Sequence, residues 1–237
     1  MEPSTIVAIQ KHAAREYPRE SCGVIIANRF GKEQYVECRN LAPGKDHFIM
    51  DGRDYAAAEM AGDIIAIVHS HPNVSATPSQ ADLVECERSK LPWVIVNWPT
   101  GQIHEFKPTG YKAPLVGRQF VHGILDCYTL VRDYFREELG IDIPDFERSD
   151  GWWHKGENLY VRNYQKAGFF QVRQEDLKKH DVIIMQVASP KDPNHAAIYI
   201  GNNMILHHVM RRISCRTTYG GYWRKHTALI VRHRALT

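Results

Sequence analysis

Two groups of residues in this 237-residue chain have the types and spacing of reactive centres. In the first group, His69 and His71 end an apolar run, and Asp82 follows in the next polar segment. Residues two apart on a strand share a face, so both imidazoles can serve one ion. Two imidazoles and a carboxylate suit zinc, and three protein ligands leave a fourth position for water, as in catalytic sites. Glu20 is the candidate base for that water.

The second group centres on a cysteine at the predicted start of a helix. Cys127 follows Asp126, and a thiol at this position meets the positive end of the helix dipole, which favours the nucleophilic thiolate. A cysteine nucleophile also needs an imidazole and a group that orients it. His195 opens a predicted strand, and in a hairpin either His207 or His208 lies across from it, depending on the register.

Each of these residues also has a plain structural explanation. Ser79-x-x-Asp82 is a helix capping box, and Asp126 caps a helix without doing chemistry. A lone Cys127 is more often a small buried hydrophobe than a nucleophile. The combination and order of the residues, more than any one of them, favour the two reactive centres.

The elements that position the first group alternate between helix and strand. We expect the first helix to be capped by Ser4 and to end before Pro18. Apolar periodicity predicts helices at 4–17, 54–62 and 79–90, and strands at 22–27, 64–71 and 93–98. This alternation predicts an α/β sandwich.

The second group sits on a helix that is followed by a run of strands. The helix over 127–139 has one apolar face, and Gly140 stops it. Predicted strands follow at 182–187, 195–200, 204–208 and 228–232. One helix before an antiparallel sheet is an α+β pattern. Prolines and glycines between the halves predict a first domain at 1–108, a linker at 109–116 and a second domain at 117–237.

Composition excludes several classes of protein. Apolar residues make up 43% and charged residues 24% of the chain, which is ordinary for globular proteins. We expect no membrane span, because no apolar run approaches about 18 residues, and the N-terminus does not resemble a secretory signal. The five cysteines lack a CxxC pair, which disfavours a disulfide framework. The net charge is +3 and basic residues are scattered, so no nucleic-acid site is predicted.

The first group resembles the JAMM (MPN+) signature, in which a glutamate precedes His-x-His, seven residues, Ser, two residues and Asp. The resemblance implies a cytidine-deaminase-like sandwich with peptidase or isopeptidase activity that depends on Zn²⁺. It also implies a role for each residue: His69, His71 and Asp82 as zinc ligands, Glu20 as general base, and Ser79 as a group that helps to hold the oxyanion.

The second group resembles the NlpC/P60 family of papain-like cysteine peptidases, through Asp126-Cys127-Tyr128, Asn194-His195 and Leu206-His207-His208. The resemblance implies that Cys127 is the nucleophile and His195 the base and acid. The spacing usual in the family selects His207 as the orienting residue. Substrates would be bacterial peptidoglycan peptides, cut between D-glutamate and diaminopimelate. Two departures are His180 in place of a common glycine, and Leu115 in place of a common tyrosine.

The order of the two domains resembles a family of tail-tip assembly proteins of lambda-like siphophages. That resemblance implies phage tail-tip proteins as partners, assembly in the host cytoplasm and a place at the virion tail tip. An alternative is a non-catalytic assembly scaffold whose two sites are idle. A cellular ubiquitin-type isopeptidase would fit the first half alone and leaves Cys127 unexplained.

Overall fold

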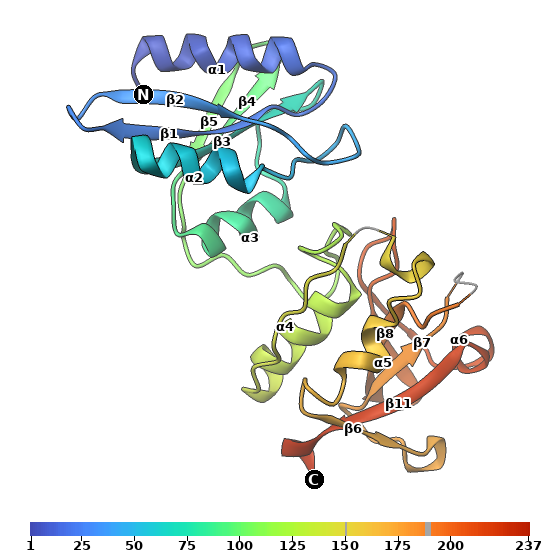
Figure 1. Ribbon diagram of the computed structural model, residues 1–237. Coiled ribbons are helices and arrows are strands. Elements are labelled where there is room, and N and C mark those ends of the chain that lie inside the picture. Colours follow the sequence, from blue (N-terminus) through green and yellow to red (C-terminus); the bar gives the residue numbers. More distant parts are fainter. Residues whose placement is uncertain (150, 188–190) are drawn as a thin grey trace. The chain divides into compact units, whose positions relative to one another are not determined.

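The computed structural model describes residues 1–149, 151–187 and 191–237 (Figure 1). The chain divides into two compact units, Met1–Lys112 and Ala113–Thr237, which are described separately below. The boundary falls within the segment predicted to be a linker. The assignment of 109–116 as a linker between two enzymatic domains remains a prediction.

The first unit is an α/β sandwich built on one five-stranded sheet, as predicted. The strand order is β2-β1-β3-β4-β5, in which β3 and β4 run parallel and the other neighbours run antiparallel. The strands are β1 (Cys22–Asn28), β2 (Glu33–Cys38), β3 (Gly62–Pro72), β4 (Trp93–Trp98) and β5 (Ile103–Phe106). The helices are α1 (Pro3–Glu16), α2 (Gly52–Ala61) and α3 (Gln80–Ser89).

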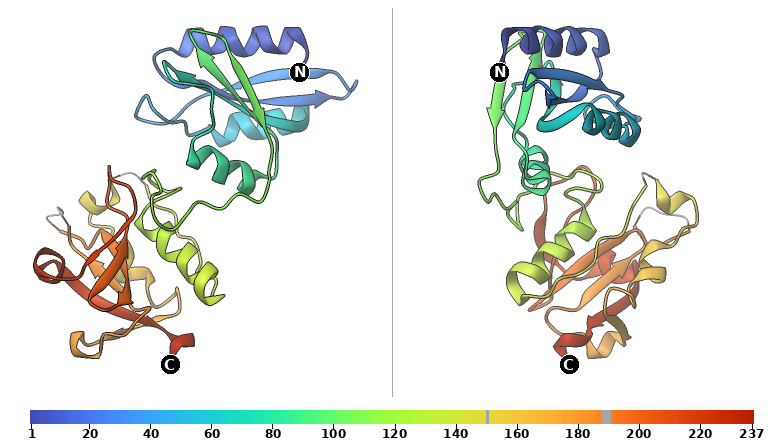
Figure 2. Two further views of the ribbon diagram at one scale, coloured as in Figure 1. Left: turned by 180° about the vertical axis from the view of Figure 1, so that it is seen from behind. Right: turned by 60° about the vertical axis from the view of Figure 1, so that its left-hand side comes forward.

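Helices cover both faces of this sheet, with α1 on one side and α2 on the other (Figure 2). Side chains alternate between faces along a strand, so Val68 packs in the core under α1, whereas Ile67 packs with α2 and α3. His69 and His71 therefore project from β3 on the Ile67 side. This alternation places the two predicted metal ligands on the face of the sheet that α3, which carries Asp82, also covers.

The cap predicted for the first helix is wrong. The N-cap of α1 is Glu2, without a side-chain cap, and Ser4 lies inside the helix. Pro3 begins the helix, where its missing N–H costs nothing and its fixed φ suits the first turn. The helix ends at Glu16, before Pro18, as expected.

The second unit has the predicted α+β architecture, with an antiparallel six-stranded sheet of order β10-β9-β8-β7-β11-β6. Its helices are α4 (Cys127–Leu139), α5 (Leu159–Asn163) and α6 (Gly221–Lys225). Its strands are β6 (Phe169–Val172), β7 (Val182–Met185), β8 (His195–Gly201), β9 (Met204–His207), β10 (Cys215–Thr218) and β11 (Thr227–His233). The sequence analysis did not predict α5, α6, β6 and β10, each of which is only four or five residues long.

The apolar face of helix α4 packs into the core of this unit. Leu130, Val131, Tyr134 and Phe135 are buried against residues of β7, β8, β9 and β11. Gly140 ends the helix in the left-handed conformation, with φ 66°. Packing of α4 on β8 fixes the helix N-terminus, and with it Cys127, beside the start of that strand.

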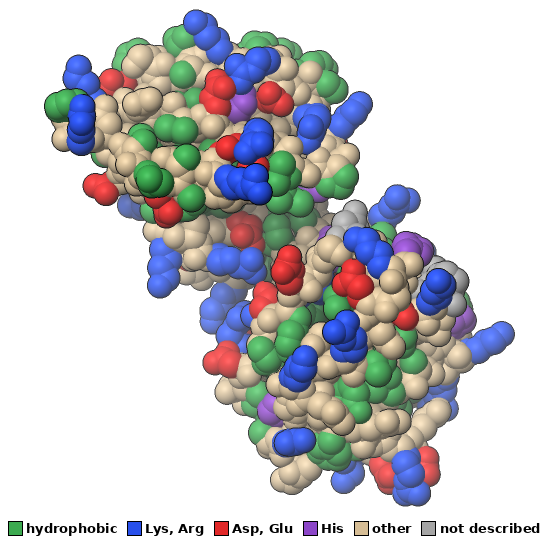
Figure 3. All heavy atoms as spheres, viewed as in Figure 1, with side chains coloured by type: hydrophobic (Ala, Val, Ile, Leu, Met, Phe, Trp, Pro, Cys, Tyr) green, Lys and Arg blue, Asp and Glu red, His purple; other side chains and the backbone are tan. Residues whose placement is uncertain are grey.

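No helix within the described residues is both long enough and apolar enough to cross a membrane. On the face of each unit that Figure 3 shows, Lys and Arg side chains are dispersed among acidic and apolar ones.

A carboxylate on α3 holds the segment that leaves the first unit. One oxygen of Glu87 accepts hydrogen bonds from the backbone N–H groups of Thr109 at 2.6 Å, Gly110 at 2.8 Å and Tyr111 at 2.9 Å. These bonds, that of Thr109 first, hold the pKa of Glu87 below its ordinary value. Because this pKa is depressed, the Glu87 carboxylate stabilises the folded protein at pH values above the pKa that Glu87 has in the unfolded chain. This stabilisation is lost as pH falls through the pKa that Glu87 has in the folded protein.

We expect Glu87→Ala to raise the rate of proteolytic cleavage within residues 109–116 several-fold, because three backbone donors lose their acceptor. Limited proteolysis with mass spectrometry of the fragments measures this rate. Glu59→Ala removes an exposed glutamate from α2 and is the matched control. Equal cleavage rates for both variants and the unmodified protein would show that Glu87 does not restrain the segment.

Candidate active sites

Strand β3 and helix α3 bring three potential metal ligands together, and each predicted ligand is one of them. Nε2 of His69 lies 3.1 Å from Nε2 of His71 and 3.2 Å from a carboxylate oxygen of Asp82. Nε2 of His71 lies 3.4 Å from the other oxygen of Asp82. Ligands at about 2.0–2.2 Å from a tetrahedral zinc stand about 3.3 Å apart. This spacing and this donor set fit a zinc ion.

Neighbouring groups orient two of these ligands. Nδ1 of His71 donates to the carbonyl oxygen of Ser75 at 2.8 Å, which leaves Nε2 as the lone-pair nitrogen. Ser79 and Asp82 form a capping box, in which the backbone N–H of Ser79 donates to Asp82 at 2.7 Å. Helix capping by Asp82 and a role of Asp82 as a metal ligand are therefore compatible, since the capping box holds the carboxylate beside the histidines.

Burial and hydrogen bonds together set the protonation of His69, Asp82 and Glu20 when no metal is bound. Burial lowers the pKa of His69, while hydrogen bonds from the two histidines overcome burial and hold the pKa of Asp82 far below its ordinary value. Burial raises the pKa of Glu20 to about 8, a rise that the nearby His71 partly opposes. The side chain of Glu20 is 8% exposed. A carboxyl group that binds a proton near neutral pH is suited to general acid–base work.

The predicted nucleophile is the first residue of α4. The carboxylate of Asp126 caps that helix by accepting from the backbone N–H of Thr129 at 2.8 Å, and it also accepts from the backbone N–H of Gly123 at 3.0 Å. Arg148 pairs with the same carboxylate at 2.9 Å. Burial would raise the pKa of Asp126, but Arg148 and the cap hold it below its ordinary value.

We expect Asp126→Asn to lower the free energy of unfolding by about 3 kcal/mol, because Arg148 loses the buried one of its two carboxylate partners and keeps only the exposed Asp145. The carboxylate has a depressed pKa, so its contribution exists above the unfolded pKa and disappears as pH falls through the folded pKa. The difference between Asp126→Asn and the unmodified protein should therefore shrink in acid. Urea unfolding at several pH values measures it, and a constant difference would contradict the assignment.

Cys127 and His195 line one cleft of about 370 Å³, together with Trp152, Trp153 and Tyr160. The described side chains form no hydrogen bond between Cys127 and His195. The thiol instead contacts the hydroxyl of Tyr160, with Sγ and Oη 3.2 Å apart. Sequence reasoning missed Tyr160, and the signal available was an aromatic cluster around Asn158-Leu159-Tyr160.

The structure places His207, and not His208, against His195. Nε2 of His195 lies 3.2 Å from Nδ1 of His207, and the two rings meet edge to face. The pair is diagonal, because His207 stands opposite Ala197 in a hairpin with an irregular register. The expectation of a directly opposite pair is therefore wrong. His208 donates from Nε2 to the carbonyl oxygen of Arg212 at 3.1 Å instead.

The resting thiol is neutral, which corrects the expectation of a thiolate. Desolvation by the surrounding protein, and then the charge of Asp126, raise the pKa of Cys127 to about 11. Burial lowers the pKa of His195 to about 3 and that of His207 to about 4, so both imidazoles are neutral. In this arrangement the helix dipole does not outweigh burial, and a neutral His195 is free to accept the proton of the thiol.

Two family models match the chain, one to each unit. Residues 2–108 match prokaryotic homologs of the JAB domain, and residues 117–232 match the NlpC/P60 family. Tail tip assembly protein K of Escherichia phage N15 is 43% identical over 99% of this chain and 96% of its own length. The chain belongs to the tail tip assembly protein K family. The K protein of Escherichia phage lambda is 42% identical over 78% of this chain and 90% of its own length.

Solved structures also resemble single units of this K-family chain. A JAB1/MPN domain protein from Archaeoglobus fulgidus has a TM-score of 0.33, at 16% identity, over 46% of this chain and 90% of its own. An NLP/P60-family lipoprotein-like structure from Staphylococcus aureus has a TM-score of 0.37, at 19% identity, over 50% of this chain and 37% of its own.

The K-family chain accommodates its two departures from the NlpC/P60 pattern locally. His180 adopts φ 78°, a conformation that glycine reaches without strain, and Nδ1 of His180 lies 2.8 Å from the Tyr134 hydroxyl. Leu115 packs against the hydrophobic core. Phe120 and Tyr128 line the cleft, but the hydroxyl that reaches the thiol belongs to Tyr160.

Proposed function

We propose that the protein is a tail-tip assembly protein with two peptidase sites, a zinc-dependent peptidase or isopeptidase in the first unit and a cysteine endopeptidase in the second. The observation that carries the proposal is the cleft that Cys127 and His195 both line, with His207 hydrogen-bonded to His195. The ligand spacing of His69, His71 and Asp82 supports the first site. The names of the K proteins of phages N15 and lambda support the role in assembly.

In the cysteine site, His195 would act first as base and then as acid. When Nε2 of His195 donates to Nδ1 of His207, Nδ1 of His195 becomes the lone-pair nitrogen. It takes the proton of Cys127, and Sγ attacks the scissile carbonyl carbon. As the C–N bond breaks, His195 returns the proton to the leaving amine, and water then hydrolyses the thioester. His207 fixes the tautomer throughout.

The substrate that we propose for this site is a peptidoglycan stem peptide, cut between D-glutamate and diaminopimelate. The NlpC/P60 family match and the bacteriophage relatives support this choice. Such cleavage would serve tail assembly or passage through the cell wall. The protein would act in the host cytoplasm during assembly and at the tail tip, with other tail-tip proteins as its partners.

In the first site, zinc when bound would lower the pKa of water and polarise the substrate carbonyl. His69, His71 and Asp82 would hold the ion, and the Glu20 carboxylate would accept the proton of the attacking water and pass it to the leaving amine. The hydroxyl of Ser79 keeps its own hydrogen while its oxygen caps α3, so that hydrogen is available to the developing oxyanion.

The test is incubation of the purified protein with defined muropeptides, with mass spectrometry of the products. A cut between D-glutamate and diaminopimelate would establish the reaction. Phages that carry Cys127→Ala or Glu20→Gln then test the purpose of each site. Normal tails and normal infectivity for both variants, together with intact muropeptides, would favour the scaffold with idle sites.

A further inference from the structure

The hydroxyl of Tyr160 is placed at the reacting atom of the cysteine site. Its oxygen lies 3.2 Å from Sγ of Cys127, within hydrogen-bonding distance for sulfur. Tyr160 comes from the short helix α5, which is remote in sequence from α4 and from the histidine hairpin. The contact between Tyr160 and Cys127 therefore depends on how α5 packs in the folded unit.

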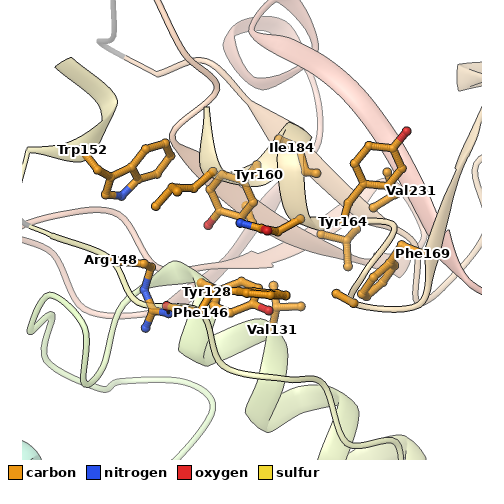
Figure 4. Close-up of a pocket in the computed structure, with 15 residues that line it drawn as sticks. Tyr128, Val131, Phe146, Arg148, Trp152, Tyr160, Tyr164, Phe169, Ile184 and Val231 are labelled. Carbon is orange, nitrogen blue, oxygen red and sulfur yellow. Dashed lines mark hydrogen bonds between the residues drawn. The ribbon is translucent and has the colours of Figure 1, made fainter. Parts of the chain in front are cut away.

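Aromatic neighbours restrict the ring that carries this hydroxyl. Trp152 and Tyr128 both meet Tyr160 edge to face, at centroid distances of 5.9 Å and 6.1 Å. Figure 4 shows the Trp152 ring to one side of Tyr160 and the Tyr128 ring below it. The backbone N–H of Asn158, directly before α5, donates to Asp192 at 3.1 Å, which ties the helix to the segment that precedes β8. The hydroxyl is thus held in place before any substrate binds.

The charged groups near the thiol do not replace this donor. Asp126 carries a negative charge that opposes the thiolate. The positive charge of Arg148 is shared with Asp126 at 2.9 Å and Asp145 at 2.8 Å. Burial keeps His195 neutral, as it does His208, and the cleft is also lined by His122 and His154. The thiolate that forms when His195 accepts the proton is therefore stabilised by hydrogen bonds at Sγ, from the backbone of Ala196 and from the side chain of Tyr160.

Towards a thiolate, the hydroxyl of Tyr160 acts as a donor. Burial raises the pKa of Tyr160 well above its ordinary value, so the hydroxyl keeps its proton. A neutral thiol can either donate to this hydroxyl or accept from it, whereas a thiolate only accepts. Loss of the thiol proton thus fixes the direction of the bond. Hydrogen bonds to charged groups are stronger than those between neutral groups.

We infer that Tyr160 is a further catalytic residue, whose hydroxyl donates to Sγ of Cys127 and stabilises the thiolate during transfer of the thiol proton to His195. This inference rests on the proposed cysteine peptidase. Tyr160 retains its own proton, so only one proton moves in this step. That proton leaves Sγ, enters His195 and later reaches the leaving amine.

The test compares Tyr160→Phe with Tyr164→Phe, in the full-length protein. Both variants lose one hydroxyl, but Tyr164 follows α5 and its hydroxyl accepts from Gln165, away from the thiol. The rate of alkylation of Cys127 by iodoacetamide is measured against pH, with mass spectrometry of the peptide that contains Cys127. This readout requires no peptidase substrate.

We expect Tyr160→Phe to shift the alkylation profile to higher pH by about one unit or more, because the thiolate loses a charge-assisted bond. At neutral pH the rate should fall about threefold or more, since a more basic thiolate is also more nucleophilic and offsets part of the loss. Tyr164→Phe should follow the unmodified protein. A Tyr160→Phe profile that coincides with the unmodified one, or that moves to lower pH, would overturn the inference.

Muropeptide cleavage separates this inference from the proposed function. If the unmodified protein cleaves, Tyr160→Phe should lower kcat with little change in KM, because the bond acts on the nucleophile and not on the bound peptide. If the unmodified protein does not cleave but the alkylation profile still shifts, the proposed function fails while the assignment of Tyr160 as thiolate donor stands.

Discussion

Cys127→Ala should lower the rate of muropeptide cleavage by about 10⁴-fold or more, because the variant has no atom that can form the thioester. Alanine also suits the first turn of α4, and the Asp126 cap and its pairing with Arg148 do not involve the thiol. The variant should therefore fold as the unmodified protein does. Initial rates of product formation by mass spectrometry measure the loss.

Cys86→Ala is the matched control for this experiment. It removes a buried thiol from α3 of the first unit and should leave muropeptide cleavage unchanged. His207→Ala should also lower the rate strongly, since His195 then loses the partner that fixes its tautomer. Cleavage by Cys127→Ala at a rate near that of the unmodified protein would exclude the thiol mechanism and assign any activity to another site.

Asp82→Asn should weaken zinc binding at the first site by more than about 100-fold. Loss of outer-shell partners alone costs 10–100-fold, and this change removes the negative charge of a direct ligand candidate. Asparagine keeps an oxygen that can accept from the backbone N–H of Ser79, so the capping box that starts α3 should survive. Elemental analysis of the purified proteins, with competitive titration against a zinc chelator, measures the change.

The matched control is Asp63→Asn, which makes the same charge change at an exposed position of β3. It should retain zinc as the unmodified protein does. A chelator should also lower the thermal stability of the unmodified first unit, because a ligand at 100 times its Kd stabilises the folded state by about 2.7 kcal/mol. Equal zinc content in Asp82→Asn and Asp63→Asn would contradict the proposed ligand set.

The sequence alone predicted most of the elements that carry the sites. The residues of α4 repeat with the helical period, and Asp126 and Gly140 mark its two ends, so all the information is local. His69 and His71 share a face because side chains alternate along β3, which is also a local property. For the same reason, the two fold classes and the order of the two units followed from spacing and motif.

Tertiary structure decided what depends on contacts between distant segments. The residues alone left His207 and His208 open as the partner of His195, although the spacing usual in the NlpC/P60 family favoured His207. The irregular register of the hairpin is what brings His207 to His195. Tyr160 reaches the thiol only because α5 packs beside α4. The neutral state of Cys127 has the same origin, since desolvation depends on everything that surrounds an atom and here opposes the helix dipole. Sequence spacing thus determined which groups are present, and packing determined which of them touch and which carry charge.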